Sequence, residues 1–380
     1  MFALAGVTGA GVARNHPRSA GSEMSSTPRS SSVLSIPASL RSEVINSERR
    51  GKRKDPVAEG NMRILSVVEC HETIMCCKYN EMGKLLAVGF VDGSIKVYSG
   101  ETGSILYSLG DHNTQESHLP CTSINFKPHL EGDRSENHLL ATYASGMVKL
   151  WHMSTGQCLH TSHEARQTLT AAYNQDATLY VTGGSDTKLN VYDTTTGQIC
   201  KTCEPSPSVT IMDGHRFRVF SIKFHPHDNA SFVSGGWDDT VQFWNTTSEH
   251  SIRKLNGPHI CGDALDIDPH HNHVVTGSWR TEYNLQIWDY STGALIKNVP
   301  QDYNNSLLYC AQWLGKDHIL VGGCEANLTR IVDRGTLQTT GRLADLPRGV
   351  YCLDNNRQGN VPKFAAGSDR SLFFLDMKQD

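Results

Sequence analysis

The sequence predicts an all-β fold for most of the chain, and three observations lead to this prediction. From Met62 onward, short runs rich in β-branched and aromatic residues alternate with turns that contain glycine, aspartate and asparagine. Glycine is abundant, at 33 of 380 residues. The same pattern also returns several times along the chain at a regular interval. Together these features indicate a repeat architecture that is built from small β-sheets.

The repeat is visible in strings such as "LLATYASGMVKLWHMSTGQCL", "YVTGGSDTKLNVYDTTTGQIC" and "FVSGGWDDTVQFWNTTSEHSI". Seven copies align on one aromatic or apolar anchor, and consecutive anchors are 53, 41, 52, 44, 43 and 44 residues apart. A period of about 40 to 45 residues is the signature of propeller blades with four strands each. The sequence therefore predicts a seven-bladed β-propeller of four-stranded antiparallel blades. The anchors are Tyr98, Trp151, Tyr192, Trp244, Trp288, Ile331 and Leu375.

The two ends of the repeat array are incomplete in a complementary way. The seventh copy ends at "SLFFLDMKQD" and has no outer strand after it. The segment "NMRILSVVEC", residues 61–70, is a strand-like run without a blade of its own. Pairing of this segment with the seventh blade would remove an open sheet edge. We therefore expect an N-terminal strand to close the ring.

Residues 1–60 differ from the rest of the chain and are predicted to form a disordered tail, which the propeller at 61–380 follows. The strings "SEMSSTPRSSSVLSIPASLRS" and "ERRGKRKD" have no hydrophobic period, so they cannot bury enough surface to offset the entropy of ordering. Residues 1–23 are open to a second interpretation as a targeting segment. The basic cluster from Arg49 to Lys54 is interpreted either as a nuclear localisation signal or as a solvated linker.

Composition limits the classes of protein that fit. The net charge of −4 argues against a propeller that binds nucleic acid, because such proteins carry a positive excess. No apolar run approaches the roughly 20 residues that span a bilayer, so no membrane insertion is expected. The 11 cysteines are odd in number and irregularly spaced, which favours reduced thiols. We expect a cytoplasmic protein, with a nuclear fraction if the basic cluster is a localisation signal.

The fourth copy carries the most specific motif. A Gly-His pair, Gly214–His215, precedes "SIKFHPHD" and then "SGGWDDTVQFWN". Together with the period, these residues resemble the WD-repeat β-propeller family over about residues 62–380. The resemblance implies that a histidine, a serine or threonine, an aspartate and a tryptophan of one repeat form a buried hydrogen-bonded tetrad. The matching residues are His215, Ser234, Asp238 and Trp244, and the third copy varies the plan with His163, Thr182, Asp186 and Tyr192.

Ser234, His215 and Asp238 are also the residue types of a hydrolase triad. A catalytic serine needs exposure, an oxyanion hole and a substrate cleft. The glycines here follow Ser234 instead of flanking it as in the G-x-S-x-G nucleophile elbow. We therefore expect a structural role for these three residues and no catalytic residues in the chain.

Two histidine-rich turns, "FHPHDN" (224–229) and "DPHHNH" (268–273), raise the alternative of a metal site. Both fall between the first two strands of their blades, where a polar turn with proline is common. The Cys200–Cys203 pair has no second pair that could complete a zinc site. We expect neither a metal nor a cofactor.

Two tryptophans lie outside the tetrad pattern. Trp237 and Trp279 occupy equivalent loops, between the second and third strands of the fourth and fifth blades. Alignment of the repeats places four arginines near the same face, and tryptophan and arginine dominate the energetics of interfaces. These six residues are candidates for partner binding, and packing between blades is the alternative. The arginines are Arg216, Arg218, Arg280 and Arg348.

The sequence and the resemblance together predict a non-catalytic scaffold or adaptor. It would bind protein or peptide partners on one propeller face, within a multiprotein complex. The alternative is a chromatin- or nucleic-acid-associated protein that is directed by the basic tail. An enzyme that uses the central channel is the least favoured class, because no paired carboxylates or nucleophile site stand out.

Overall fold

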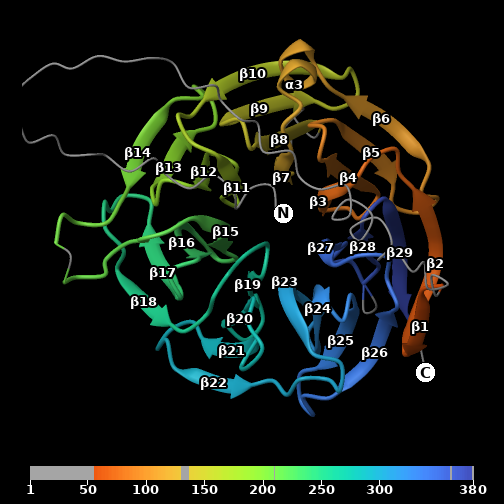
Figure 1. Cartoon of the computed structure of the whole chain (residues 1–380). Coiled ribbons are helices and arrows are strands. Elements are labelled where there is room, and N and C mark those ends of the chain that lie inside the picture. The colour runs from red at the N-terminus through yellow and green to blue at the C-terminus, as the bar shows by residue number, and fades with distance from the viewer. Residues whose placement is uncertain (1–54, 130–136, 209, 360–361, 379–380) are drawn as a thin grey trace, which may run out of the picture. The chain divides into compact units, whose positions relative to one another are not determined.

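The computed structural model describes residues 55–129, 137–208, 210–359 and 362–378. These residues form seven antiparallel sheets that are arranged as blades around a central axis (Figure 1). The predicted seven-bladed β-propeller is therefore confirmed. Most of the predicted tail, including the cluster from Arg49 to Lys54, lies outside the described residues.

The first four blades follow the chain in order, and each runs from the centre to the rim. Blade 1 consists of β3 (Ile74–Tyr79), β4 (Leu85–Phe90), β5 (Ile95–Ser99) and β6 (Ile105–Leu109). Blade 2 consists of β7 (Cys121–Phe126), β8 (His138–Tyr143), β9 (Met147–His152) and β10 (Gln157–His163). Blade 3 consists of β11 (Thr168–Tyr173), β12 (Leu179–Gly184), β13 (Leu189–Asp193) and β14 (Ile199–Cys203). Blade 4 consists of β15 (Val219–His225), β16 (Asp228–Gly236), β17 (Thr240–Asn245) and β18 (Arg253–Asn256).

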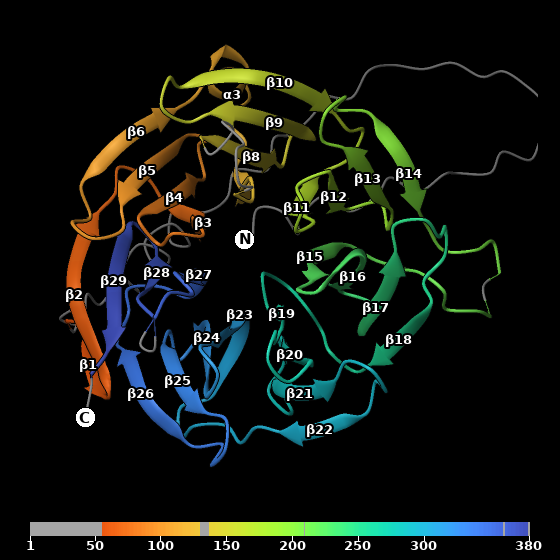
Figure 2. The same ribbon diagram turned by 180° about the vertical axis from the view of Figure 1, so that it is seen from behind.

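The last three blades complete the ring, as the view from behind also shows (Figure 2). Blade 5 consists of β19 (Leu265–Ile267), β20 (His273–Gly277), β21 (Leu285–Asp289) and β22 (Leu295–Asn298). Blade 6 contains β23 (Ser306–Leu314), β24 (His318–Glu325), β25 (Thr329–Asp333) and β26 (Thr339–Ala344). Blade 7 contains β27 (Val350–Asn355), β28 (Phe364–Ser368) and β29 (Ser371–Met377), with β2 (Met62–Glu69) as its fourth strand.

The ring closes between the two ends of the propeller, as the sequence predicted. β2 pairs antiparallel with β29 in a register that places Met62 opposite Met377. The Arg63 guanidinium fastens this seam through two bonds to the Asp376 carboxylate, at 2.9 Å from Nε and 2.5 Å from Nη2. Because the closing strand is non-local, blade 7 depends on residues more than 300 positions away in the sequence.

The propeller begins earlier than the predicted boundary at residue 61. Val57–Gly60 form a further strand, β1, which adds a fifth strand to blade 6 by pairing with β26. These four residues were predicted to belong to the tail, because a run of four residues carries no hydrophobic period. Their strand is fixed by main-chain pairing and by the Glu59–Arg342 ion pair at 2.8 Å, and neither contact leaves a hydrophobic pattern.

The hydrophobic core lies between neighbouring blades. Trp151 and Trp244, two of the predicted anchors, are almost fully buried. The cluster around Trp151 joins side chains of blades 1 and 2, and another around Trp313 joins blades 5 and 6. Each blade therefore stabilises its neighbours. No helix among the described residues is long and apolar enough to cross a bilayer.

The antiparallel order of the strands gives the propeller two distinct faces. The loop face carries the loops between second and third strands and the connections between blades. The turn face carries the turns between first and second and between third and fourth strands. The insertion at residues 110–120 lies on the loop face and contains a short helix, α3 (His112–Ser117).

Candidate functional site

A buried polar network in blade 4 joins the four residues that the resemblance pointed to. His215 Nε2 lies 2.6 Å from Ser234 Oγ, and its Nδ1 lies 2.8 Å from the Asp238 carboxylate. The Trp244 indole donates to Ser234 Oγ at 2.7 Å. Asp238 also accepts the backbone N–H of Arg216 at 2.8 Å. The network therefore ties the entry into β15 to β16, β17 and the loop between them.

The geometry of this network suits structure and not hydrolysis. His215 and Ser234 are fully buried, so a substrate carbonyl has no path to the hydroxyl. Burial by itself raises the pKa of Asp238, but bonds from His215, Arg216 and Thr240 outweigh it and leave the pKa below its usual value. The ionised carboxylate thus holds the imidazole and the loop in place.

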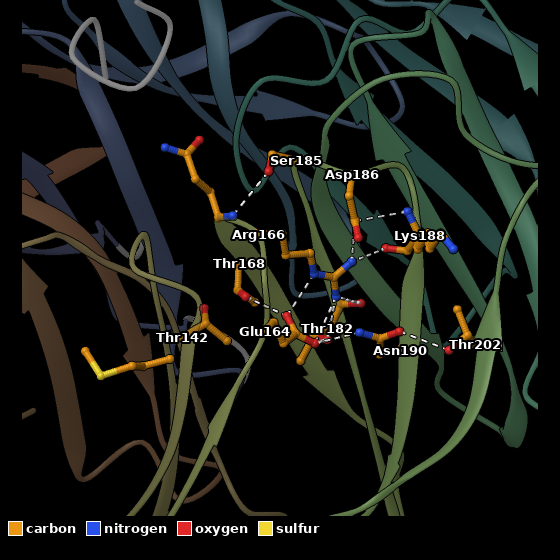
Figure 3. Close-up of polar contacts among 12 residues, drawn as sticks. Thr142, Glu164, Arg166, Thr168, Thr182, Ser185, Asp186, Lys188, Asn190 and Thr202 are labelled. Carbon is orange, nitrogen blue, oxygen red and sulfur yellow. Dashed lines mark hydrogen bonds and ion pairs between the residues drawn. The ribbon is translucent and has the colours of Figure 1, made fainter. Parts of the chain in front are cut away.

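Blade 3 contains a different network, which is centred on Glu164 (Figure 3). The Glu164 carboxylate accepts two bonds from Arg166, at 2.9 Å from Nε and 3.0 Å from Nη2. It also accepts bonds of 2.5–2.8 Å from the side chains of four further residues. These four donors are Thr168, Thr182, Asn190 and Tyr192. Arg166 Nη1 extends the network to Asp186 at 2.6 Å.

The prediction that His163 belongs to this network is wrong. His163 is the last residue of β10 and is exposed, while the next residue, Glu164, points inward and is buried. Neighbouring residues in an extended chain face opposite sides, so a shift of one position exchanges the two. Thr182, Asp186 and Tyr192 do lie in the network, with Glu164 and Arg166 in place of the histidine.

The charges of this pair are strongly stabilised in the folded state. Burial would raise the pKa of Glu164, but the Arg166 charge and hydrogen bonds from Arg166, Thr168 and Asn190 lower it from 4.5 to about 2. The pKa of Arg166 is affected by burial, which lowers it, and by Glu164 and Asp186, which raise it above its usual value overall. A buried ion pair with this many hydrogen bonds favours a single conformation of the blade.

The loop face carries two sets of three aromatic rings that a main-chain hydrogen bond joins, and we call the two sets together the aromatic arc. Phe220 lies 5.4 Å from Trp237, measured between ring centroids, and Trp237 lies 6.4 Å from His259. The Trp279 backbone N–H bonds the His259 carbonyl at 2.9 Å. Trp279 then lies 6.5 Å from Tyr309, which lies 5.0 Å from Tyr351. The arc consists of Phe220, Trp237, His259, Trp279, Tyr309 and Tyr351.

Three residues of the arc are placed by β-bulges. In blades 4, 6 and 7 the pairing of first and second strands skips one residue near the start of the first strand, which is Phe220, Tyr309 or Tyr351. Bulges of this kind redirect a side chain away from the regular alternation. Blades 1 to 3 have the same bulge at Met75, Thr122 and Leu169, none of which is aromatic. The arc is therefore confined to one side of the ring.

The two tryptophans of the sequence analysis differ in their exposure. Trp237 is half-buried, and its indole N–H donates to Cys261 Sγ at 3.0 Å. Trp279 is exposed over 36% of its surface. Phe217 and Tyr283, each 59% exposed, lie in nearby loops of the same face. Trp237 thus contributes to packing between blades, and Trp279 presents an open apolar surface.

The four arginines make two kinds of contact: Arg216 and Arg280 donate to main-chain carbonyls, whereas Arg218 lies over a ring and Arg348 lies near a carboxylate. Arg216 donates to the carbonyls of Ser208 and Ile211, and so fastens the insertion at residues 203–214. Arg280 donates to the Gly257 and Tyr283 carbonyls and holds the loops around Trp279. Arg218 lies over the Trp237 ring, 5.6 Å from its centroid. Arg348 is largely exposed, with Nε 3.7 Å from Asp369.

The histidine-rich turns lie together on the turn face, and ring nitrogens of His225, His227 and His271 are engaged by neighbouring groups. His225 bonds Asn272 at 2.9 Å, and His227 bonds the Pro269 carbonyl at 2.9 Å. His271 lies 2.8 Å from both Asp268 and Arg334. Across the described ranges, no three histidine, cysteine, aspartate or glutamate side chains converge as metal ligands.

Comparison with known proteins agrees with the propeller fold and with the position of the buried tetrad. A family model described as "WD domain, G-beta repeat" matches residues 206–245, which contain the whole tetrad of blade 4. A second, described as "Anaphase-promoting complex subunit 4 WD40 domain", matches residues 60–129.

Several curated relatives share low identity with the chain. Protein FIZZY-RELATED 3 of Arabidopsis thaliana is 21% identical over 68% of this chain and 50% of its own length. The APC/C activator protein CDH1 of Saccharomyces cerevisiae is 25% identical over 47% of this chain and 29% of its own length. The Periodic tryptophan protein 2 homolog of Dictyostelium discoideum is 24% identical, over 60% and 23% respectively. The chain thus spans half or less of the length of these relatives.

The repeat period, the seven blades and the buried tetrad describe one architecture, and the family match falls on the blade where the tetrad is complete. On this evidence the chain is a seven-bladed β-propeller that resembles the WD-repeat proteins, and its fourth blade matches the WD-repeat family model.

Proposed function

We propose that the chain is a non-catalytic adaptor, which binds a protein or peptide partner on its loop face within a multiprotein complex. The observation that carries this proposal is the aromatic arc, because it joins rings from four neighbouring blades on one face. Aromatic residues and arginine supply most of the binding energy at protein interfaces. Arg348 and Arg218 stand at the two sides of the arc and are suited to acidic groups of a partner.

The relatives support a role inside an assembly. One of them is named as an activator of the APC/C, and one matching family model is described as a subunit of the anaphase-promoting complex. The burial of His215 and Ser234 supports the non-catalytic part of the proposal, because the residues that most resemble a nucleophile and its base are committed to the fold.

Affinity purification of the full chain, followed by mass spectrometry and cross-linking, tests the proposal. We expect stable protein partners whose cross-links fall on loops around the arc. Partners that cross-link only to the turn face would contradict it. The alternative function is binding to nucleic acid through the basic tail. Measuring nucleic-acid binding at increasing salt concentration, with and without residues 1–54, tests it, because phosphate contacts weaken steeply as salt rises.

A further inference from the structure

A cleft opens between blades 2 and 3, away from the aromatic arc. Its volume is about 270 Å³, and side chains of both blades line it. The turn between β13 and β14, at residues 194–197, forms one wall, so the cleft opens toward the turn face. The adaptor function proposed above does not use this cleft.

The walls of the cleft are apolar and aromatic. Leu159 contributes a side chain that is 45% exposed, and Val148 and Leu140 lie deeper in blade 2. Blade 3 contributes Tyr173 and Tyr180, whose rings meet edge to face with centroids 5.8 Å apart. Among the described residues, no aspartate, glutamate, lysine or arginine lines the cleft. A charged group would lose its hydration here without gaining a partner, so the cleft is suited to an uncharged group.

Two hydroxyl groups in the cleft lack partners. The Tyr173 hydroxyl and Thr194 Oγ1 are both buried, and neither has a hydrogen-bond partner among the described residues. Tyr173 itself is more than nine-tenths buried. A buried hydroxyl that is left unpaired destabilises the protein, and each of these groups can both donate and accept. The cleft therefore offers two polar contacts inside an apolar enclosure.

The size of the cleft narrows the class of ligand. Sites for whole small molecules usually measure about 300 to 1,000 Å³, whereas a cavity of about 150 Å³ takes a benzene ring. At about 270 Å³, the cleft has room for one large side chain and the peptide groups next to it. We propose that it is a second recognition site, which takes one uncharged aromatic or large aliphatic side chain of a partner peptide, with adjoining peptide groups bonded to Tyr173 and Thr194.

Titration of the full chain with four probes tests this proposal. The probes are the N-acetyl amides of phenylalanine, leucine, lysine and glutamate, and the readout is the methyl NMR spectrum of labelled leucine and valine. We expect the phenylalanine and leucine probes to shift the methyl resonances of Leu140, Val148 and Leu159, and the two charged probes to leave them in place. A cleft that holds only water would show no shift with any probe at millimolar concentration, and that result overturns the proposal.

Two variants assign the binding to the cleft. Leu159→Glu places a charge at its mouth and is expected to weaken the phenylalanine probe at least tenfold. Leu106→Glu is the matched control, because Leu106 is 46% exposed and occupies the same bulge position in the outer strand of blade 1. Tyr173→Phe removes only the hydroxyl and should weaken binding about fivefold. Equal affinity in the wild type and in both Leu159→Glu and Tyr173→Phe would refute the site, whatever the fate of the loop-face proposal.

Discussion

Glu164 and Arg166 form a buried ion pair with two parallel hydrogen bonds, in the blade where the sequence suggested a histidine. Both residues lie in the connection that leads from blade 2 into blade 3, and the pair reaches β12 and β13 through Thr182, Asn190 and Tyr192. It thus fulfils the same task as His215 and Asp238 in blade 4, with a carboxylate as the central acceptor.

Replacement of Glu164 by glutamine should destabilise the protein severely. The change leaves the Arg166 charge buried with only Asp186 as an anionic partner, and such losses typically cost about 3–5 kcal/mol. Asp186→Asn is the matched control, since the Asp186 side chain is 40% exposed and its loss should cost much less. Urea denaturation measures the free energy of unfolding of both variants. Similar midpoints for the two variants would show that the pair contributes little.

The same carboxylate predicts a pH dependence. The pKa of Glu164 is about 2 in the folded state against an ordinary value of 4.5, so its contribution to stability is complete above pH 4.5 and is lost as pH falls toward 2. A shift of this size corresponds to about 3 kcal/mol. We expect the stability of the wild type to fall more steeply between pH 5 and pH 2 than that of Glu164→Gln. Parallel curves would contradict the assigned charge state.

Blade 4 offers a test of the buried tetrad. Ser234→Ala removes the hydroxyl that joins His215 and Trp244, and so leaves two buried ring nitrogens without a partner. The expected loss of stability is about 1–3 kcal/mol. Thermal denaturation provides the measurement, with the change Ser248→Ala at a half-buried turn position nearby as a control for serine loss. An unchanged melting temperature for Ser234→Ala would argue against a structural role.

Three N-terminal truncations test how the ring closes. Removal of residues 1–54 should leave stability unchanged, because this segment has no burial pattern in its sequence. Removal of 1–60 also deletes β1 and should cost about 1–2 kcal/mol, since the strand is short and largely exposed. Removal of 1–70 deletes β2, opens blade 7 and should yield insoluble protein. The solubility and melting temperature of the three truncated proteins are measured. A soluble and stable protein without residues 1–70 would refute the closure of the ring by β2.

Much of the fold could be predicted because it repeats. A period of 41 to 53 residues set the number of blades, and the incomplete seventh copy indicated where the N-terminal strand would pair. β1 escaped prediction because a strand of four residues is too short to show a period of its own. Main-chain pairing, which holds β1 to blade 6, does not depend on side-chain identity.

The candidate site was predicted less completely, for reasons of register. His163 and Glu164 are adjacent, and only the point at which β10 ends decides which of them faces inward. The string "HEAR" contained the signal, because an acid two residues before an arginine can form a pair. Phe220, Tyr309 and Tyr351 reach the arc through bulges, and an aligned comparison of the residues near the start of each inner strand could have found them.

The most direct test of the adaptor proposal compares two double variants in partner binding. Trp279→Ala with Arg348→Ala removes an exposed ring and an exposed charge at the aromatic arc, while His270→Ala with His271→Ala changes the turn face. Loss of one interface anchor typically costs about 2 kcal/mol, or about 30-fold in affinity. We expect the first variant to lose the partners recovered by affinity purification, with circular dichroism and melting temperature unchanged, and the second to retain them. Loss of binding in the histidine variant alone would contradict the account and assign the partner to the turn face.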